Sequence, residues 1–439
     1  MKRNILAFLL IGFLSPLIFA QDIDRAKLDN YFNALEENNK FMGSVAVSQN
    51  GDIIYTNSVG YADFENKVKA NEETKYRIGS ISKTFTAVLV LKAVEENKLE
   101  LDQTIEKFFP TIKNAKKITI ENLLRHRSGI HNFTNDEDYL TWNTQAKTEK
   151  EMVEIIIDAG SDFEPSTKAE YSNSNYVLLT YILEKTYNAS FAELLTKYIT
   201  KPIGLTNTYF GSKIDSKKNE AKSYRYLGDW KVEPETDTSI PLGAGGIVST
   251  PSDLVTFSDA LFSGKLLKAE SLEQMKTVKD QFGLGLFTIP FSDKTGYGHT
   301  GGIDGFASIF THFSDGNISY AMTTNGANSN TNDISIAVLS AAYNIPFTTP
   351  DFKSYEVTAE ELEQYVGTYS STQIPLQITV TKENNSLFAQ ATGQSPFPLE
   401  ATEKDTFKFD LAGVVMEFNP AENTMILKQA GGVYAFTKD

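Results

Sequence analysis

The chain has 439 residues, of which 41% are hydrophobic and none is cysteine, and its formal net charge is -15. The lack of cysteine excludes a disulfide framework, thiolate zinc sites and a lipid-anchored lipoprotein N-terminus. The negative charge argues against nucleic acid as a partner, and the length suggests two or three domains.

The first twenty residues have the pattern of a cleavable secretory signal peptide. Lys2 and Arg3 form a basic start, residues 5–14 are apolar, and Ala20 stands at the expected cleavage point. The alternative is a membrane anchor, for which the run is short compared with the ~20 residues of a spanning helix. We therefore expect a periplasmic or secreted protein with no transmembrane span in the mature chain.

Periodicity and turn signals over residues 21–346 predict helices mixed with antiparallel strands. Asn50-Gly51 between two apolar runs predicts a hairpin near the N-terminus, and a second hairpin is predicted from strands at 305–312 and 318–324. The predicted helices cover residues 22–40, 80–97, 148–157, 175–185, 191–198, 249–262 and 332–343. Residues 205–247 are mixed in character and are expected to line a substrate cleft.

The pattern changes after residue 346. Residues 347–357 include Pro350 and predict a linker. Short alternating runs then recur with turn signals between them, which is typical of a small antiparallel barrel or sandwich. These runs lie at 376–381, 386–391, 407–411, 414–418, 424–428 and 433–436. We therefore expect a separate all-β domain over residues 358–439.

Ser80 and Lys83 lie three residues apart at the start of a predicted helix, so the hydroxyl and the amine can meet on one face. This helix is apolar almost all round, which indicates burial. Desolvation lowers the pKa of a buried lysine, and a neutral Lys83 can accept the proton of a nucleophilic Ser80. Alone the S-x-x-K match is weak, because Ser80 could simply cap a helix that leaves Lys83 exposed.

A second group is Tyr171-Ser172-Asn173. A Tyr171 phenol near Lys83 could be partly ionised and pass a proton between Ser80 and the leaving group. The Asn173 amide could orient both Lys83 and a substrate carbonyl. The alternative is a loop tyrosine beside a helix cap.

A third group is His299-Thr300-Gly301-Gly302. Glycine lets a strand approach a substrate backbone closely, and the N–H groups of Gly302 and Ser80 could form an oxyanion hole. Each such donor is worth ~2.7–4 kcal/mol. An imidazole at position 299 would titrate near pH ~6.5, whereas the alternative is a strand-edge histidine with no chemistry.

In this order, the three groups resemble the motifs of the serine β-lactamase and penicillin-binding-protein superfamily, in particular its class C β-lactamase, D-peptidase and esterase branch. The resemblance spans roughly residues 25–345. It implies an α+β fold, with an antiparallel sheet flanked by helices and a helical subdomain facing it. The tail that begins with residues 365–369 is similar to the lipocalin-like β-barrel that is often appended to such hydrolases.

The resemblance also implies roles for the motif residues. The implied catalytic residues are Ser80, Lys83 and Tyr171. The implied substrate contacts are Asn173, His299, Thr300 and Gly301, and the implied oxyanion hole consists of the Ser80 and Gly302 N–H groups.

Lys294-Thr295-Gly296 is a literal K-T-G and therefore a rival third motif. Gly305-Phe306 follows His299, and not Lys294, at the family's distance, so we expect residues 294–296 to form a hairpin turn. A typical β-lactamase carries lysine where this chain has His299, which favours peptidase or esterase activity. The remaining histidines, 126, 131 and 312, show no metal-ligand spacing and are predicted to be structural.

The sequence thus predicts a secreted serine hydrolase that acts through an acyl-enzyme, without metal or cofactor. The expected substrates are D-amino-acid peptides, cell-wall fragments or small esters. The alternatives are a class C-like β-lactamase and a non-catalytic protein that keeps the fold to bind peptidoglycan or a partner.

Overall fold

A computed structural model describes residues 23–352, 355–383 and 385–439. The predicted signal peptide lies outside these residues. Within them, no helix has the length and apolar character needed to cross a membrane.

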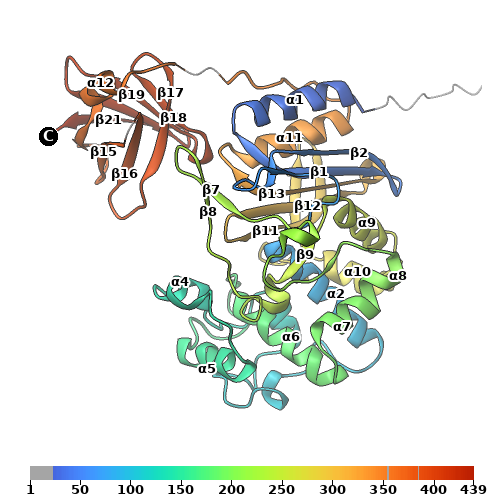
Figure 1. The fold of residues 1–439 in the computed structure, drawn as a ribbon. Helices are drawn as coiled ribbons and strands as arrows, with labels where there is room; N and C mark the ends of the chain where they lie inside the picture. Colours follow the sequence, from blue (N-terminus) through green and yellow to red (C-terminus); the bar gives the residue numbers. More distant parts are fainter. Residues whose placement is uncertain (1–22, 353–354, 384) are drawn as a thin grey trace, which may run out of the picture.

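The N-terminal part of the chain is built on a six-stranded antiparallel sheet with the order β10-β11-β12-β13-β1-β2 (Figure 1). Its strands are β1 (Phe41–Gln49), β2 (Asp52–Val59), β10 (Phe287–Phe291), β11 (Lys294–Ile303), β12 (Phe306–Phe313) and β13 (Ile318–Ala327). Both predicted hairpins are present, since β1 pairs with β2 and β12 with β13. The sheet brings the first and last strands of this part together, because β1 lies between β2 and β13.

Helices cover both faces of the sheet. Alternate residues of β1 face opposite sides, so that Val45 and Val47 pack with α1 (Arg25–Glu37) and α11 (Thr331–Ala342), whereas Ala46 faces α2 (Ser82–Glu95) and α9 (Pro251–Phe262). The fold is therefore the predicted α+β class, with a helical layer on each side.

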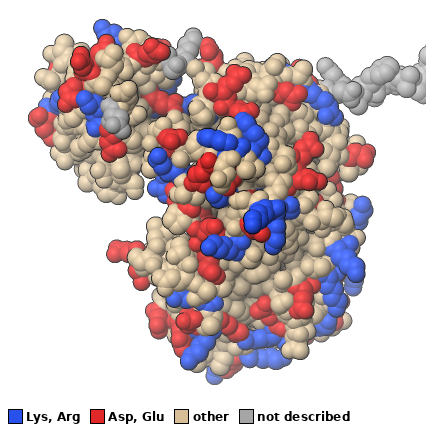
Figure 2. All heavy atoms as spheres, viewed as in Figure 1, with Lys and Arg blue, Asp and Glu red and all other residues tan. Residues whose placement is uncertain are grey.

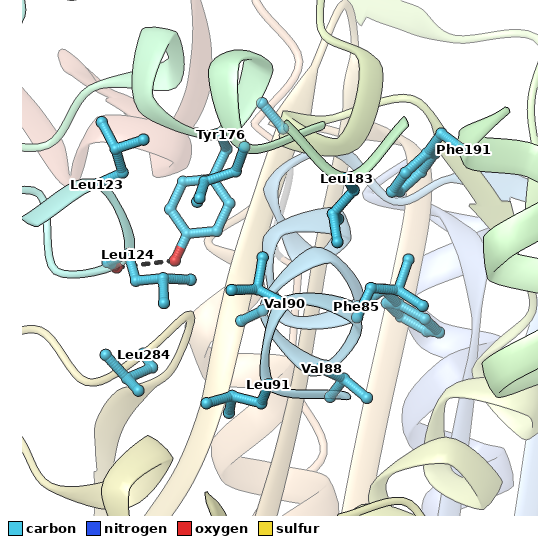
Figure 3. Packing of buried hydrophobic residues seen from close by; sticks show 14 of the residues in the cluster. Phe85, Val88, Val90, Leu91, Leu123, Leu124, Tyr176, Leu183, Phe191 and Leu284 are labelled. Carbon is cyan, nitrogen blue, oxygen red and sulfur yellow. Dashed lines mark hydrogen bonds between the residues drawn. The ribbon is translucent and has the colours of Figure 1, made fainter. Parts of the chain in front are cut away.

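Helix α2 is buried on nearly every side. Its side chains pack between the sheet and the helices of the facing region (Figure 3), and the rings of Phe85 and Phe257 stack 3.8 Å apart. This burial confirms the inference from the apolar sequence. It also encloses Lys83, whose exposed fraction is 0%.

The facing region is mainly helical. The helices in and beside this region are α3 (Ile120–Leu124), α4 (Tyr139–Trp142), α5 (Glu149–Ala159), α6 (Asn173–Tyr187), α7 (Phe191–Leu195), α8 (Lys201–Ile203) and α10 (Ala269–Lys276). Short strands form small sheets of their own, in which β3 pairs with β4, β9 with β5 and β6, and β7 with β8. Their bounds are β3 (Tyr61–Asp63), β4 (Val68–Lys69), β5 (Tyr76–Arg77), β6 (Tyr209–Phe210), β7 (Tyr224–Tyr226), β8 (Trp230–Val232) and β9 (Ile247–Ser249). Helix α6 begins two residues earlier than predicted, which places Asn173 in its first turn.

The C-terminal part is a closed antiparallel barrel, in which β14 pairs with β21 to complete the circle. A short helix, α12 (Ala359–Leu362), precedes strands β14 (Gly367–Ser370), β15 (Gln377–Glu383), β16 (Ser386–Ala391), β17 (Phe397–Glu403), β18 (Thr406–Phe409), β19 (Val414–Asn419), β20 (Thr424–Gln429) and β21 (Gly432–Lys438). The sequence did not predict β14 or β17. Pro398 weakens the strand signal of β17, although the barrel tolerates it opposite Phe388.

Charged contacts join the barrel to the N-terminal part. The Lys40 ammonium is buried and contacts the carboxylates of Glu400 and Asp410, the latter at 3.2 Å. A cavity of about 830 Å³ lies beside these contacts. On the face shown in Figure 2, acidic and basic side chains are interspersed over both parts.

Limited proteolysis should cut within residues 347–357 and leave a protected N-terminal fragment that contains Ser80. The N-terminal part and the barrel have separate hydrophobic cores, so each should survive loss of the connection. Mass spectrometry of the fragments, with fluorophosphonate labelling of the larger one, would check this. Degradation without a protected fragment would contradict it.

Candidate active site

Ser80 lies in a 3-10 turn, Gly79–Ile81, directly before α2. This turn packs against the end of β11. Gly79 has φ +49, and a Cβ added to it would lie 2.8 Å from the Gly302 nitrogen; a Cβ on Gly301 would lie 2.0 Å from the Ile78 carbonyl oxygen. The turn and the strand lie so close together that only glycine fits at these two positions. Ser80 and Gly302 therefore lie on adjacent segments.

Lys83 is the centre of the polar contacts. Its Nζ lies 3.0 Å from Ser80 Oγ, 2.7 Å from Asn173 Oδ1 and 2.7 Å from the Ala244 carbonyl oxygen. Burial holds the pKa of Lys83 well below its usual value. A charged Lys83 would donate to all three of these oxygens; once neutral, it keeps two N–H donors for the two carbonyl-type acceptors and has a lone pair that can accept the proton of the Ser80 hydroxyl.

Tyr171 also lies beside Lys83. Its ring centroid lies 4.9 Å from Lys83 Nζ. Burial raises the pKa of Tyr171 strongly, and a hydrogen bond with Ser80 opposes this only in part. The expectation of a partly ionised phenol is therefore wrong for this arrangement, because a phenolate loses too much hydration in the site.

Asn173 is held in a fixed orientation. Its Oδ1 accepts from Lys83, while its Nδ2 donates to Thr134 Oγ1 at 3.0 Å and Asn132 Oδ1 at 3.2 Å. The amide therefore orients Lys83, as predicted. Its contact with a substrate carbonyl stays a prediction.

The end of β11 presents an uncovered edge. Strand β10 pairs with β11 only from Lys294 to Gly298, so residues 299–303 have no partner from β10. Thr300 is exposed there. A substrate backbone could pair with this edge as an added strand.

His299 is buried at this edge with 1% of its surface exposed. Its ring lies 4.2 Å from that of Phe287, and its Nδ1 lies 2.5 Å from the Thr300 carbonyl oxygen. Burial lowers the pKa of His299 to about 3. The expectation that His299 titrates near pH ~6.5 is therefore wrong, and the imidazole is neutral at physiological pH.

Lys294 lies at the opposite end of β11. It begins the strand, and the turn itself is formed by the two residues before it, so the predicted hairpin turn is displaced. Its ammonium contacts the Asp315 carboxylate. The literal K-T-G is thus separated from His299 by half the strand.

His299→Ala should lower kcat/KM by ~10–10²-fold, the loss typical of a misplaced substrate, because the ring supports the uncovered edge. Lys294→Ala is the matched control on the same strand and should leave kcat/KM unchanged. Steady-state kinetics of both variants would check this. A damaging Lys294→Ala with a silent His299→Ala would mean that the third motif is wrongly assigned.

The sequence missed two components of this site. One is the Ala244 carbonyl, which has no sequence signature because any residue supplies a carbonyl. The other is His126, whose ring lies 4.4 Å from that of Tyr171. By contrast, His312 stacks on Phe262 at 4.5 Å, remote from these contacts and consistent with a structural role. Within the described parts of the chain, no cluster of histidines and carboxylates could hold a metal ion.

Comparison with known proteins gives two family matches. The family model described as Beta-lactamase matches residues 28–344. A domain of unknown function, DUF3471, matches residues 353–427, which include most of the barrel.

One relative extends over nearly the whole chain, and others match about two thirds of it or slightly more. A penicillin-binding protein of Bacillus subtilis (strain 168) is 26% identical over 437 residues, covering 91% of this chain and 94% of its own length. The teichoic acid D-alanine hydrolase of Staphylococcus aureus (strain MRSA252) is 28% identical over 300 residues, covering 66% and 71%. Among solved structures, the D-amino acid amidase of Ochrobactrum anthropi SV3, in complex with L-phenylalanine amide, is similar with a TM-score of 0.64 and 26% identity, covering 72% of this chain and 99% of that one.

Proposed function

This chain belongs to the beta-lactamase family and is a serine hydrolase, and we propose that it is a secreted enzyme that hydrolyses amides or esters of D-amino acids through an acyl-enzyme. The observation that carries this proposal is the position of buried Lys83 between Ser80 Oγ, Asn173 Oδ1 and the Ala244 carbonyl oxygen. This arrangement suits a neutral amine that accepts the Ser80 proton.

Acylation begins as Ser80 Oγ attacks the substrate carbonyl carbon and its proton moves to Lys83 Nζ. The carbonyl oxygen gains negative charge and accepts hydrogen bonds from the N–H groups of Ser80 and Gly302. Tyr171, protonated at the start, donates its proton to the leaving nitrogen or oxygen. Lys83 then returns a proton to Tyr171, so these two groups finish with the protons that they had, and the Ser80 proton has in effect moved to the leaving group.

Deacylation follows the same route in reverse. Water attacks the Ser80 ester, its proton passes through Tyr171 and Lys83, and Ser80 leaves with a proton as the D-amino acid departs. The chemistry needs no metal or cofactor. The uncovered edge of β11 at Thr300 and Gly301 would hold the substrate backbone.

The proposed substrate class rests on two relatives, the D-amino acid amidase and the teichoic acid D-alanine hydrolase. A panel of D-phenylalanine amide, a D-alanine ester, their L-counterparts and the β-lactam nitrocefin would test it. Hydrolysis of the D-compounds with a mass increase on Ser80 would support the proposal. Turnover of nitrocefin alone would favour a class C-like β-lactamase, and no labelling at all would favour a non-catalytic binding protein.

The pH dependence should follow Lys83. A protonated Lys83 cannot accept the Ser80 proton, so kcat/KM should fall as the pH drops through the lowered pKa of this amine. His299, with its pKa near 3, should add no transition around neutrality. The pH–rate profile of His299→Gln should have the same shape around neutrality as that of the wild type. Loss of a transition in the variant would mean that His299 titrates in this range and is not a neutral imidazole throughout.

A further inference from the structure

His126 binds the chain on both sides of Tyr171. Its main-chain oxygen accepts the Glu170 N–H at 2.9 Å, and its ring Nδ1 accepts the Ser172 N–H at 3.1 Å. Tyr171 precedes α6 and lies outside regular secondary structure, so no helical or strand ladder fixes its backbone. One residue thus supplies two hydrogen bonds that define where the Tyr171 main chain lies.

The His126 ring also contacts the Tyr171 side chain directly. The ring centroids are 4.4 Å apart, and His126 in turn packs against Tyr176 at 5.3 Å and Phe282 at 4.9 Å. His126 is only 2% exposed, so it has little freedom to move. Backbone and ring of Tyr171 are therefore both set by the same histidine.

The segment that carries His126 is itself anchored. The Tyr176 hydroxyl donates to the Leu124 carbonyl oxygen at 2.8 Å (Figure 3), which joins the end of α3 to α6. Arg125 donates to the Thr277 carbonyl oxygen at 2.6 Å. His126 then takes a left-handed backbone with φ 55, which turns its ring towards residues 170–172.

The Nδ1 atom of His126 carries no proton that it could give to the reacting groups, because it accepts the Ser172 N–H. No described hydrogen bond joins it to Ser80 or Lys83. Its effect must therefore pass through the residues that it holds. We propose that His126 is a positioning residue that aims the Tyr171 hydroxyl at the leaving group, an inference that rests on the proposed role of Tyr171 as proton donor.

Two substitutions separate the contacts of His126. His126→Phe keeps a ring but removes the Nδ1 acceptor. His126→Asn replaces the acceptor with Oδ1, and asparagine tolerates a left-handed backbone. If His126→Phe fails to fold because phenylalanine disfavours the left-handed backbone at this position, the asparagine variant still carries the test.

The readout is the ratio of amide to activated-ester hydrolysis. An amine leaves only with a proton, whereas p-nitrophenolate leaves without one. Displacement of Tyr171 should therefore reduce kcat for a D-amino acid amide by ~10²-fold in His126→Phe, the loss expected from a misplacement of about 1 Å. The p-nitrophenyl ester should change far less, and His126→Asn should recover part of the amide activity.

His312→Asn is the matched control for the loss of a buried imidazole, since His312 stacks on Phe262 and bonds Ser319 away from the site. It should lower the melting temperature without changing the amide-to-ester ratio. A double variant, His126→Phe with Tyr171→Phe, should be no slower on the amide than Tyr171→Phe alone.

Two results would overturn the inference and leave the proposed function intact. One is an equal loss on amide and ester in His126→Phe; the other is a multiplied loss in the double variant. If Tyr171→Phe by itself leaves amide hydrolysis unchanged, the proton-donor role fails, and the inference about His126 fails with it.

Discussion

Ser80→Ala should abolish turnover and covalent labelling while leaving the fold intact. The Ser80 hydroxyl contacts Lys83 Nζ at 3.0 Å, and no other side chain in the described site is placed to replace it as nucleophile. The change removes one oxygen from a turn at the mouth of α2, so it costs little packing. Fluorophosphonate labelling, steady-state kinetics and circular dichroism of the purified variant would check these points.

Ser82→Ala is the matched control for this variant. Ser82 lies two residues away and its hydroxyl accepts the Ile247 N–H at 3.1 Å, which is a structural contact. Its loss should reduce stability by about 1–3 kcal/mol, since it leaves a buried donor unpaired, but labelling should persist. Retained hydrolysis in Ser80→Ala would remove Ser80 from the role of nucleophile.

Tyr171→Phe should lower the acylation rate on an amide by ~10²–10⁴-fold, the range for a lost acid or base group. Burial keeps the Tyr171 phenol protonated, which equips it to donate to a leaving amine. Lys83 cannot substitute directly, because Asn173 and Ala244 hold its other hydrogen-bonding positions. Single-turnover kinetics with an amide and with a p-nitrophenyl ester would measure the effect.

The phenylalanine side chain keeps the ring that packs against His126, so the fold should be preserved and the melting temperature nearly unchanged. An amide rate within a few-fold of the wild type would mean that the proton reaches the leaving group from Lys83 or from solvent. A large loss on both substrates would instead indicate that Tyr171 acts on Ser80 itself.

Local patterns were sufficient for the two hairpins, for most of the long helices and for the proximity of Ser80 to Lys83. Asn50-Gly51 predicts its hairpin because this dipeptide adopts the left-handed turn at little cost. The apolar run after Ser80 predicts a buried helix because no face of it is polar. Burial of Lys83 follows from that run, and the i, i+3 spacing is enough to bring it to Ser80.

Electrostatic states depend on contacts between distant segments and could not be read from the motifs. His299 and Tyr171 have ordinary-looking neighbours in sequence, yet both are enclosed in the fold, which lowers the pKa of one and raises that of the other. Burial of this kind is a property of the packed molecule, because desolvation depends on every atom nearby.

The sequence by itself determined the mixture of helices with antiparallel strands, the all-β character of the C-terminal part and the proximity of Ser80 to Lys83, since each depends on local periodicity or spacing; their roles as nucleophile and base rest on the three motifs taken together. Only the tertiary structure decided that the Ala244 carbonyl contacts Lys83, that β10 leaves the edge at Thr300 uncovered, and that His126 holds Tyr171 on both sides. These hydrogen bonds of Lys83 and His126 join residues separated by 44 to 161 positions along the chain. Such hydrogen-bonded pairs form only when the helices pack on the sheet, and a local sequence pattern does not specify which residues will be partners.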